Sequence, residues 1–259
     1  FWMRVYEIPE GSKNSKGRAI QNLVNIEQDD KVKAFICTQD LKDDDYINNH
    51  YVIMATKMGQ VKKTSLEQYS RPRSNGINAI TIKDGDELLE AKLTNGNSQI
   101  MLAVKSGKAI RFEESKTRPM GRNASGVRGI RLKDNKDEVV GMISVNDMDA
   151  NILVVSENGY GKRSSLEDYR LTNRGGKGVK TISITTKTGQ LVSLKSVTDS
   201  DDLMIINKSG IAIRMQVADL RVMGRATQGV KVISIKDGDG IAAVAKVMND
   251  EEELSLIHI

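Results

Sequence analysis

The residues best suited to chemistry in this chain are its lysines and arginines, because they gather at one repeated place. Residues 57–83, 105–133, 157–184 and 208–236 hold 27 Lys and Arg against 7 Asp and Glu, whereas the remainder holds 12 against 27. A merely solvated protein face usually mixes both signs of charge. A single-sign excess repeated four times predicts a belt of positive charge that binds a long polyanion rather than a small ligand.

One basic residue recurs in register within these segments. It stands four positions after a glycine in each of them, as Lys63, Arg111, Arg163 and Arg214. Alternation of apolar and polar residues around it, as in Ile110-Arg111-Phe112, predicts a strand that turns this side chain outward. We therefore expect these four side chains to face solvent on the belt.

Catalytic chemistry has little support in the sequence. The only histidines are His50 and His258, too few for a His-based metal site, and we expect no metal, cofactor or catalytic residue. Gly121 to Gly126 has the glycine spacing of a phosphate-binding P-loop, but Val127-Arg128 follows where that loop needs Lys and then Ser or Thr. Cys37 follows an apolar run, which predicts a buried, unreactive thiol. No apolar stretch is long enough to span a membrane.

A repeat near fifty residues positions the belt. Turn glycines occur 48, 52 and 51 residues apart, and loop glycines 50, 52 and 51 residues apart. The turn glycines are Gly59, Gly107, Gly159 and Gly210, and the loop glycines are Gly76, Gly126, Gly178 and Gly229. Apolar runs and alternating strands flank both sets, so each unit predicts four strands, or one blade of a propeller-like all-β array.

One unit shows the predicted blade. Its strands are expected at Ile100–Val104, Lys108–Phe112, Val127–Leu132 and Glu138–Ile143. Gly107 provides the positive φ that the tight turn between the first two strands requires.

Five units follow one another along the chain. The predicted divisions are a partial blade at 1–48, with strands at Phe1–Ile8, Ala19–Ile26 and Lys31–Thr38, and complete blades at 49–97, 98–148, 149–200 and 201–253. Residues 254–259 change character abruptly and resemble a translated sequencing adapter, so we expect a foreign tail there.

Several motifs in this order are similar to those of the C-terminal domain in the A subunit of bacterial DNA gyrase. They are Phe1–Pro9, Ser15–Ile20, Arg118–Arg122 with Gly126–Ile130, and Glu157–Arg163. The resemblance covers residues 1 to about 250. It implies a six-bladed β-pinwheel with strands exchanged between neighbouring blades, of which this chain holds about four complete blades and part of a fifth.

The resemblance also implies a function. The domain wraps double-stranded DNA around its basic rim, so that the ATP-dependent type II topoisomerase introduces negative supercoils. The partners implied are the gyrase B subunit and a second A subunit in an A2B2 heterotetramer, in the bacterial cytoplasm at the nucleoid. The catalytic tyrosine belongs to another domain, so this chain is not an enzyme on its own. The DNA-binding residues expected are Lys16, Arg18, Lys62, Lys63, Arg71, Arg73, Lys108, Arg111, Arg118, Arg122, Arg128, Lys162, Arg163, Arg170, Arg174, Lys177, Lys180, Arg214, Arg221, Arg225 and Lys231.

This chain departs from the family in one motif, the hallmark loop Gln-Arg-Arg-Gly-Gly-Lys-Gly of the first blade, which is not found in it. We expect it to precede Phe1. A related, box-like loop is present at Arg174, Gly175, Gly176, Lys177 and Gly178, after Asn173 and without the leading Gln-Arg. Two alternatives stay open: the equivalent domain in the A subunit of topoisomerase IV, which usually lacks the hallmark, and a protein-interaction propeller.

Overall fold

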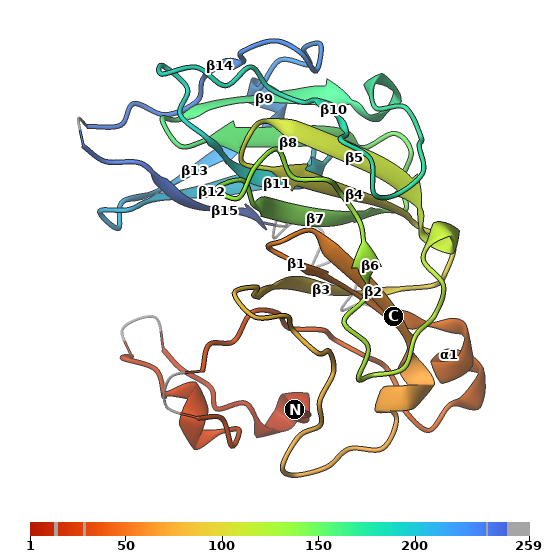
Figure 1. Cartoon of the computed structure of the whole chain (residues 1–259). Coiled ribbons are helices and arrows are strands. Elements are labelled where there is room, and N and C mark those ends of the chain that lie inside the picture. The colour runs from red at the N-terminus through yellow and green to blue at the C-terminus, as the bar shows by residue number, and fades with distance from the viewer. Residues whose placement is uncertain (13–14, 28–29, 237, 248–259) are drawn as a thin grey trace.

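The structure is a computed structural model that describes residues 1–12, 15–27, 30–236 and 238–247. Four antiparallel sheets follow one another along the chain, and Figure 1 shows them stacked face to face. This arrangement confirms the all-β, propeller-like fold. The expected tail at 254–259 and residues 248–253 of the last unit lie outside the described residues.

Each sheet is one blade, and an apolar strand lies at its centre. Blade 1 has the strand order β3(Leu88–Thr94)-β1(Tyr51–Thr56)-β2(Gln60–Ser65)-β6(Val127–Arg128), and blade 2 has β10(Val179–Lys180)-β5(Lys108–Glu113)-β4(Gln99–Val104)-β7(Val139–Val145). Blade 3 has the order β11(Leu191–Val197)-β8(Asn151–Ser156)-β9(Tyr160–Ser165)-β14(Val230–Lys231). Blade 4 has β13(Ala212–Gln216)-β12(Asp202–Asn207)-β15(Ile241–Val247).

Glycines make the connections that the repeat predicted. All four turn glycines and all four loop glycines have positive φ, between 69° and 89°. Gly59, for example, lets β1 and β2 pair directly, with Ala55 opposite Val61. A residue with a Cβ is strained at positive φ, which is why glycine recurs at the same two points in every unit.

The fourth strand of a blade comes from the next unit, as the resemblance implied. Val127–Arg128 pairs with β2 of the preceding blade, and β10 and β14 pair likewise with β5 and β9. The expected strand at Val127–Leu132 is therefore wrong in both length and placement. The chain leaves β5 through a 3-10 helix, Glu114–Lys116, and its loop then crosses to the neighbouring sheet, which limits the pairing to two residues.

The hydrophobic cores lie between the blades. Blades 1 and 2 share a cluster that includes Ile53, Val61, Leu102 and Phe112, and equivalent clusters join blade 2 to 3 and blade 3 to 4. Blades 2 and 3 have a cluster on each side, so their central strands are buried on both faces.

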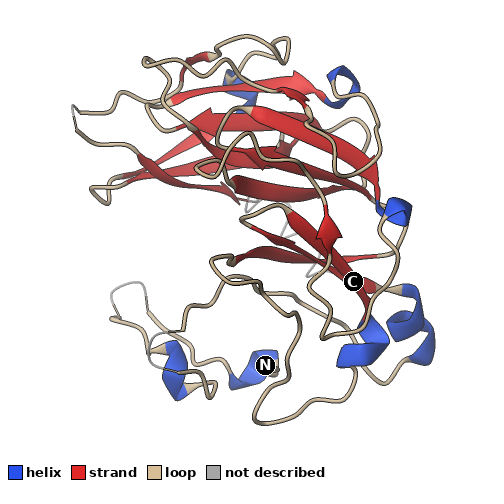
Figure 2. Cartoon of the chain, in the orientation of Figure 1, coloured by secondary structure: helices blue, strands red, loops and turns tan. Residues whose placement is uncertain are grey.

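Residues 1–49 differ from the expected partial blade. Their described part contains no strand, and Figure 2 shows loops and short helices there. The helices are 3-10 turns at Val5–Glu7 and Ile20–Asn22 and α1 at Asp44–Asn49. In the other units a central strand pairs on both sides, and the described residues of this segment include no such strand to hold two outer ones. Cys37 is also exposed, contrary to the expectation.

Further 3-10 turns follow the second strand of blades 1, 3 and 4, at Leu66–Tyr69, Leu166–Asp168 and Val217–Asp219. No helix in the described part of the chain combines the length and apolar character needed to cross a bilayer.

The loop glycines of the units that form blades 2, 3 and 4 also lie close against the backbone of the preceding blade. A Cβ at Gly178 would lie 2.5 Å from the carbonyl oxygen of Ala109, and its φ is +69°. We expect Gly178→Ala to lower the free energy of unfolding by about 2 kcal/mol or more, measured by chemical denaturation. Gly224→Ala is the matched control, because nothing lies within 4 Å of its Cβ position. Equal stability of the two variants would contradict this account of the blade contact.

Candidate nucleic-acid interface

Two exposed cations recur in the units that form blades 2, 3 and 4. The first follows the loop glycine by two positions, as Arg128, Lys180 and Lys231. The second precedes it by eight positions, as Arg118, Arg170 and Arg221. We call these six residues the rim cations.

Strand pairing explains why both sets lie along one edge. Arg128 pairs with Gln60 at one end of β2, and Pro119, next to Arg118, bridges to Lys63 near the other end. The same arrangement repeats on β5 and β9. Three residues of strand separate the two contact points, or about 10 Å. Each outer strand therefore carries a pair of cations from the next unit, and Figure 1 shows these edges along β2, β5 and β9.

The structure sorts the expected binding residues into three groups. The exposed ones are Lys16, Arg18, Arg71, Arg73, Arg118, Arg128, Arg170, Lys177, Lys180, Arg214, Arg221 and Lys231. The half-buried ones are Lys108, Arg122, Arg174 and Arg225. The buried ones are Lys62, Lys63, Arg111, Lys162 and Arg163.

The expectation that the recurring basic residue faces outward is wrong for Lys63, Arg111 and Arg163. Arg111 donates from Nη1 to the carbonyl oxygens of Leu166 and Tyr169 on the next blade, at 2.8 and 3.0 Å. Arg163 likewise donates to Leu220 O, at 2.5 Å. Alternation could not reveal this because both faces of these strands are covered, so the outward face is the neighbouring blade rather than water. Arg214, in the last blade, is exposed and pairs with Asp202.

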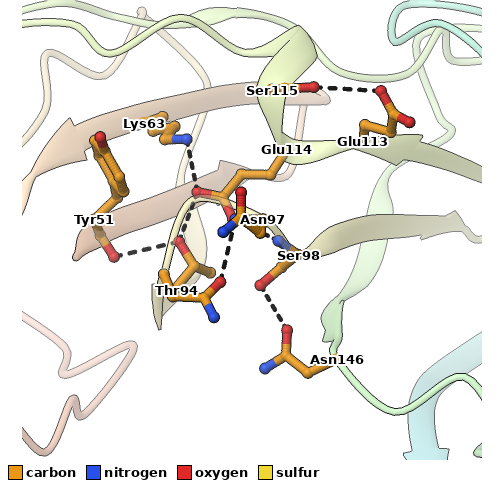
Figure 3. Close-up of polar contacts among 10 residues, drawn as sticks. Tyr51, Lys63, Thr94, Asn97, Ser98, Glu113, Glu114, Ser115 and Asn146 are labelled. Carbon is orange, nitrogen blue, oxygen red and sulfur yellow. Dashed lines mark hydrogen bonds and ion pairs between the residues drawn. The ribbon is translucent and has the colours of Figure 1, made fainter. Parts of the chain in front are cut away.

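Lys63 joins blade 1 to blade 2 through a buried carboxylate instead. Its Nζ lies 2.9 Å from Glu114 Oε1, where the two side chains are 5% and 0% exposed. Thr94 Oγ1 and Ser98 N also donate to this carboxylate, at 2.8 and 3.3 Å, as Figure 3 shows. The Lys63 ammonium further lies 4.0 Å from the centre of the Tyr51 ring. Every oxygen of the buried Glu114 thus has a donor, which is what allows a carboxylate to be buried.

One feature of the sequence points to the role of Glu114, and it is visible only when the repeats are compared position by position. Glu114 stands seven positions after its turn glycine, where the other blades have Leu66, Leu166 and Val217. A single acid among apolar equivalents indicates a joint held by an ion pair.

Lys62 and Lys162 also hold loops rather than face DNA. Lys62 Nζ donates to the carbonyl oxygens of Ala79 and Arg122, the latter at 2.5 Å. Lys162 Nζ donates to Gly224 O at 2.6 Å and Thr227 Oγ1 at 3.1 Å. Each ammonium therefore fixes the loop of the next unit through hydrogen bonds from a buried strand.

Burial lowers the pKa of both lysines to about 8. The folded state therefore releases these protons at lower pH than the unfolded chain, whose lysine pKa is near 10.4. The cost of burying the charge is present below pH 8 and falls as pH rises. We expect the free energy of unfolding to increase from pH 7.5 to 9, by up to roughly 1 kcal/mol per lysine. Denaturation of Lys162→Met should show a smaller rise, whereas the exposed control Lys177→Met should match the parent; identical slopes in all three would contradict this.

The box-like loop replaces this lysine contact by its own backbone. Ile110 stands in blade 2 where blades 1 and 3 have the lysine, and Gly175 N donates to Gly129 O at 2.6 Å. Gly175 has a φ of +81°, in the left-handed region that favours glycine. A cavity of about 160 Å³ lies between this loop and β5, with Arg170 and Lys177 among its lining residues. Lys177 is the exposed cation of this loop, whereas Arg174 is half-buried.

Comparisons with known proteins agree with this geometry. The family model described as the DNA gyrase C-terminal domain, beta-propeller, matches residues 1–39, 50–95, 99–146, 150–198 and 201–248. The A subunit of DNA gyrase from Staphylococcus aureus (strain NCTC 8325) is 43% identical over 253 residues, which are 97% of this chain and 28% of that protein. The chain therefore spans little more than a quarter of the length of this curated relative.

Two solved structures share the fold. The C-terminal domain of DNA topoisomerase IV has a TM-score of 0.86 and 25% identity, over 98% of this chain and 80% of that one. A DNA gyrase A C-terminal domain has a TM-score of 0.78 and 24% identity, over 90% of this chain and 76% of that one. With five matched repeats, four stacked sheets and exchanged strands, the chain belongs to the family of DNA gyrase C-terminal domains.

Proposed function

We propose that this chain is the DNA-wrapping module of a gyrase A subunit. The observation that carries the proposal is the pair of rim cations repeated in three successive units. A ligand that contacts all of them must be long, curved and negatively charged, and double-stranded DNA has these properties.

Binding is expected to depend on the DNA backbone rather than on base sequence. Arginine and lysine neutralise phosphates, and no element in the described part of the chain is a helix long enough to read a major groove. Bending DNA around the blades costs several kcal/mol per few tens of base pairs. Many phosphate contacts, spread over several blades, are needed to offset that cost.

In the complete protein, we propose, this module acts within an ATP-dependent type II topoisomerase that introduces negative supercoils. The gyrase B subunit and a second A subunit would complete an A2B2 assembly through regions that this chain does not include. The site of action would be the bacterial cytoplasm, at the nucleoid. The support for gyrase is the 43% identity to the A subunit of that enzyme.

The equivalent domain of topoisomerase IV is the second candidate, favoured by the TM-score of 0.86. That likeness concerns a fold that both enzymes' domains share, so it does not distinguish topoisomerase IV from gyrase. The family match and the higher identity support gyrase.

A salt titration of DNA affinity tests the proposal. Six phosphate contacts predict that log K falls with log salt at a slope of about −5, and further contacts by other exposed cations make it steeper. A scrambled duplex of equal length is the control and should bind alike. A slope near zero would overturn DNA binding and favour a protein-interaction propeller.

A further inference from the structure

Three loop arginines occupy one repeat position, four residues before the loop glycine. They are Arg122, Arg174 and Arg225, and all three are half-buried. Each donates from Nη1 to a backbone carbonyl on the preceding unit: Arg122 to Asn78 at 3.4 Å, Arg174 to Arg128 at 3.1 Å and Arg225 to Lys180 at 2.9 Å. The acceptors also share one position, two residues after their own loop glycine.

Two of these acceptors are rim cations. Arg174 holds the backbone of Arg128, and Arg225 holds the backbone of Lys180. Arg174 makes a second bond, from Nε to Lys116 O at 2.9 Å. Its guanidinium is therefore turned toward two carbonyls of the neighbouring loop.

A backbone hydrogen bond between the loops lies just beyond each arginine. Arg131 N donates to Gly176 O at 2.8 Å, and Ser183 N donates to Thr227 O at 3.1 Å. Each donor follows its rim cation by three residues. The segment that carries Arg128 or Lys180 is thus held by the next loop at two points, one at the cation itself.

We propose that Arg174 and Arg225 are positioning residues rather than phosphate ligands. They fix the backbone of Arg128 and Lys180 and so set the spacing between cations of neighbouring blades. A guanidinium suits this task because its planar donors hold a fixed direction, which the single ammonium of lysine does not. This inference rests on the proposed DNA function.

A double-mutant cycle between Arg225 and Lys180 tests it. Arg225→Lys keeps the charge but loses the planar donor. If Arg225 acts through Lys180, Arg225→Lys and Lys180→Gln should each weaken DNA binding by roughly 3- to 10-fold and reduce the salt slope by about one. The double variant should bind within about twofold of Lys180→Gln alone, because both changes remove the same contact.

The opposite results would overturn the inference. Parent-like binding of Arg225→Lys would show that the planar donor is not needed, and penalties that multiply in the double variant would identify Arg225 as an independent contact. Arg131→Lys, at an exposed arginine that is neither a rim cation nor a loop arginine, is the matched control and should change affinity less than about twofold. The cycle of Arg174→Lys with Arg128→Gln repeats the test at the neighbouring joint, so that a folding defect in one variant, seen by circular dichroism, does not decide the outcome. A flat salt slope in the parent would instead remove the proposed function itself.

Discussion

Glu114→Leu is expected to lower the free energy of unfolding by about 3–5 kcal/mol, although leucine is the residue found at this position in blades 1 and 3. The reason is Lys63, which is 5% exposed and would keep a buried charge without its carboxylate. Thr94 and the backbone N–H of Ser98 would lose their acceptor as well. Chemical denaturation monitored by circular dichroism measures the effect.

Lys63→Met combined with Glu114→Leu should recover most of that loss, since removing both partners leaves no unpaired charge. Lys105→Met is the control, because the Lys105–Glu138 pair is 33% and 38% exposed and should contribute about 0–1 kcal/mol. A double variant as unstable as Glu114→Leu would contradict the ion-pair account of this joint. Glu114→Leu with parental stability would contradict it equally.

Replacing all six rim cations by glutamine is expected to reduce DNA affinity roughly 10³-fold or more at 0.1 M salt. The salt slope should become less steep by about five, because each lost phosphate contact removes about 0.9. The side chains are exposed and lie on loops and short strands, so the fold should remain intact. Fluorescence titration with a labelled duplex at several salt concentrations measures both quantities.

A variant with the same change in net charge is the control. It replaces six lysines outside the four basic segments, namely Lys31, Lys33, Lys42, Lys136, Lys187 and Lys195. Its affinity should fall far less if position, rather than total charge, determines binding. Equal losses in the two variants would contradict the rim as the DNA surface.

Much of the fold could be predicted from the glycines. Gly107 and Gly178 required positive φ, and the distances between such glycines define one unit. These constraints are local, so the sequence expresses them directly. The source of the fourth strand in each blade depends on how the chain passes from one sheet to the next, as at Val127–Arg128, and only the resemblance implied it.

The candidate site was predicted in part. Arg118, Arg128 and Lys180 are exposed on loops and short strands, where a basic residue has little else to contact. Lys62 and Arg111 belong to the same basic segments, yet they bond to carbonyls of the next blade. Charge counts cannot separate these two uses, because both require a cation beside a loop. The difference lies in the stacking of blades, which is a contact between units about fifty residues apart.

The central claim is that the rim cations wrap DNA rather than only bind it, and ligation of nicked circular DNA tests this most directly. The chain is bound at saturation, the nick is sealed, the protein is removed, and the linking number is read from gels. Wrapping around the rim predicts that linking number shifts with bound protein, in the direction of trapped positive writhe, and that the variant lacking six rim cations leaves it unchanged. An unchanged linking number with the parent chain at saturated binding would contradict wrapping.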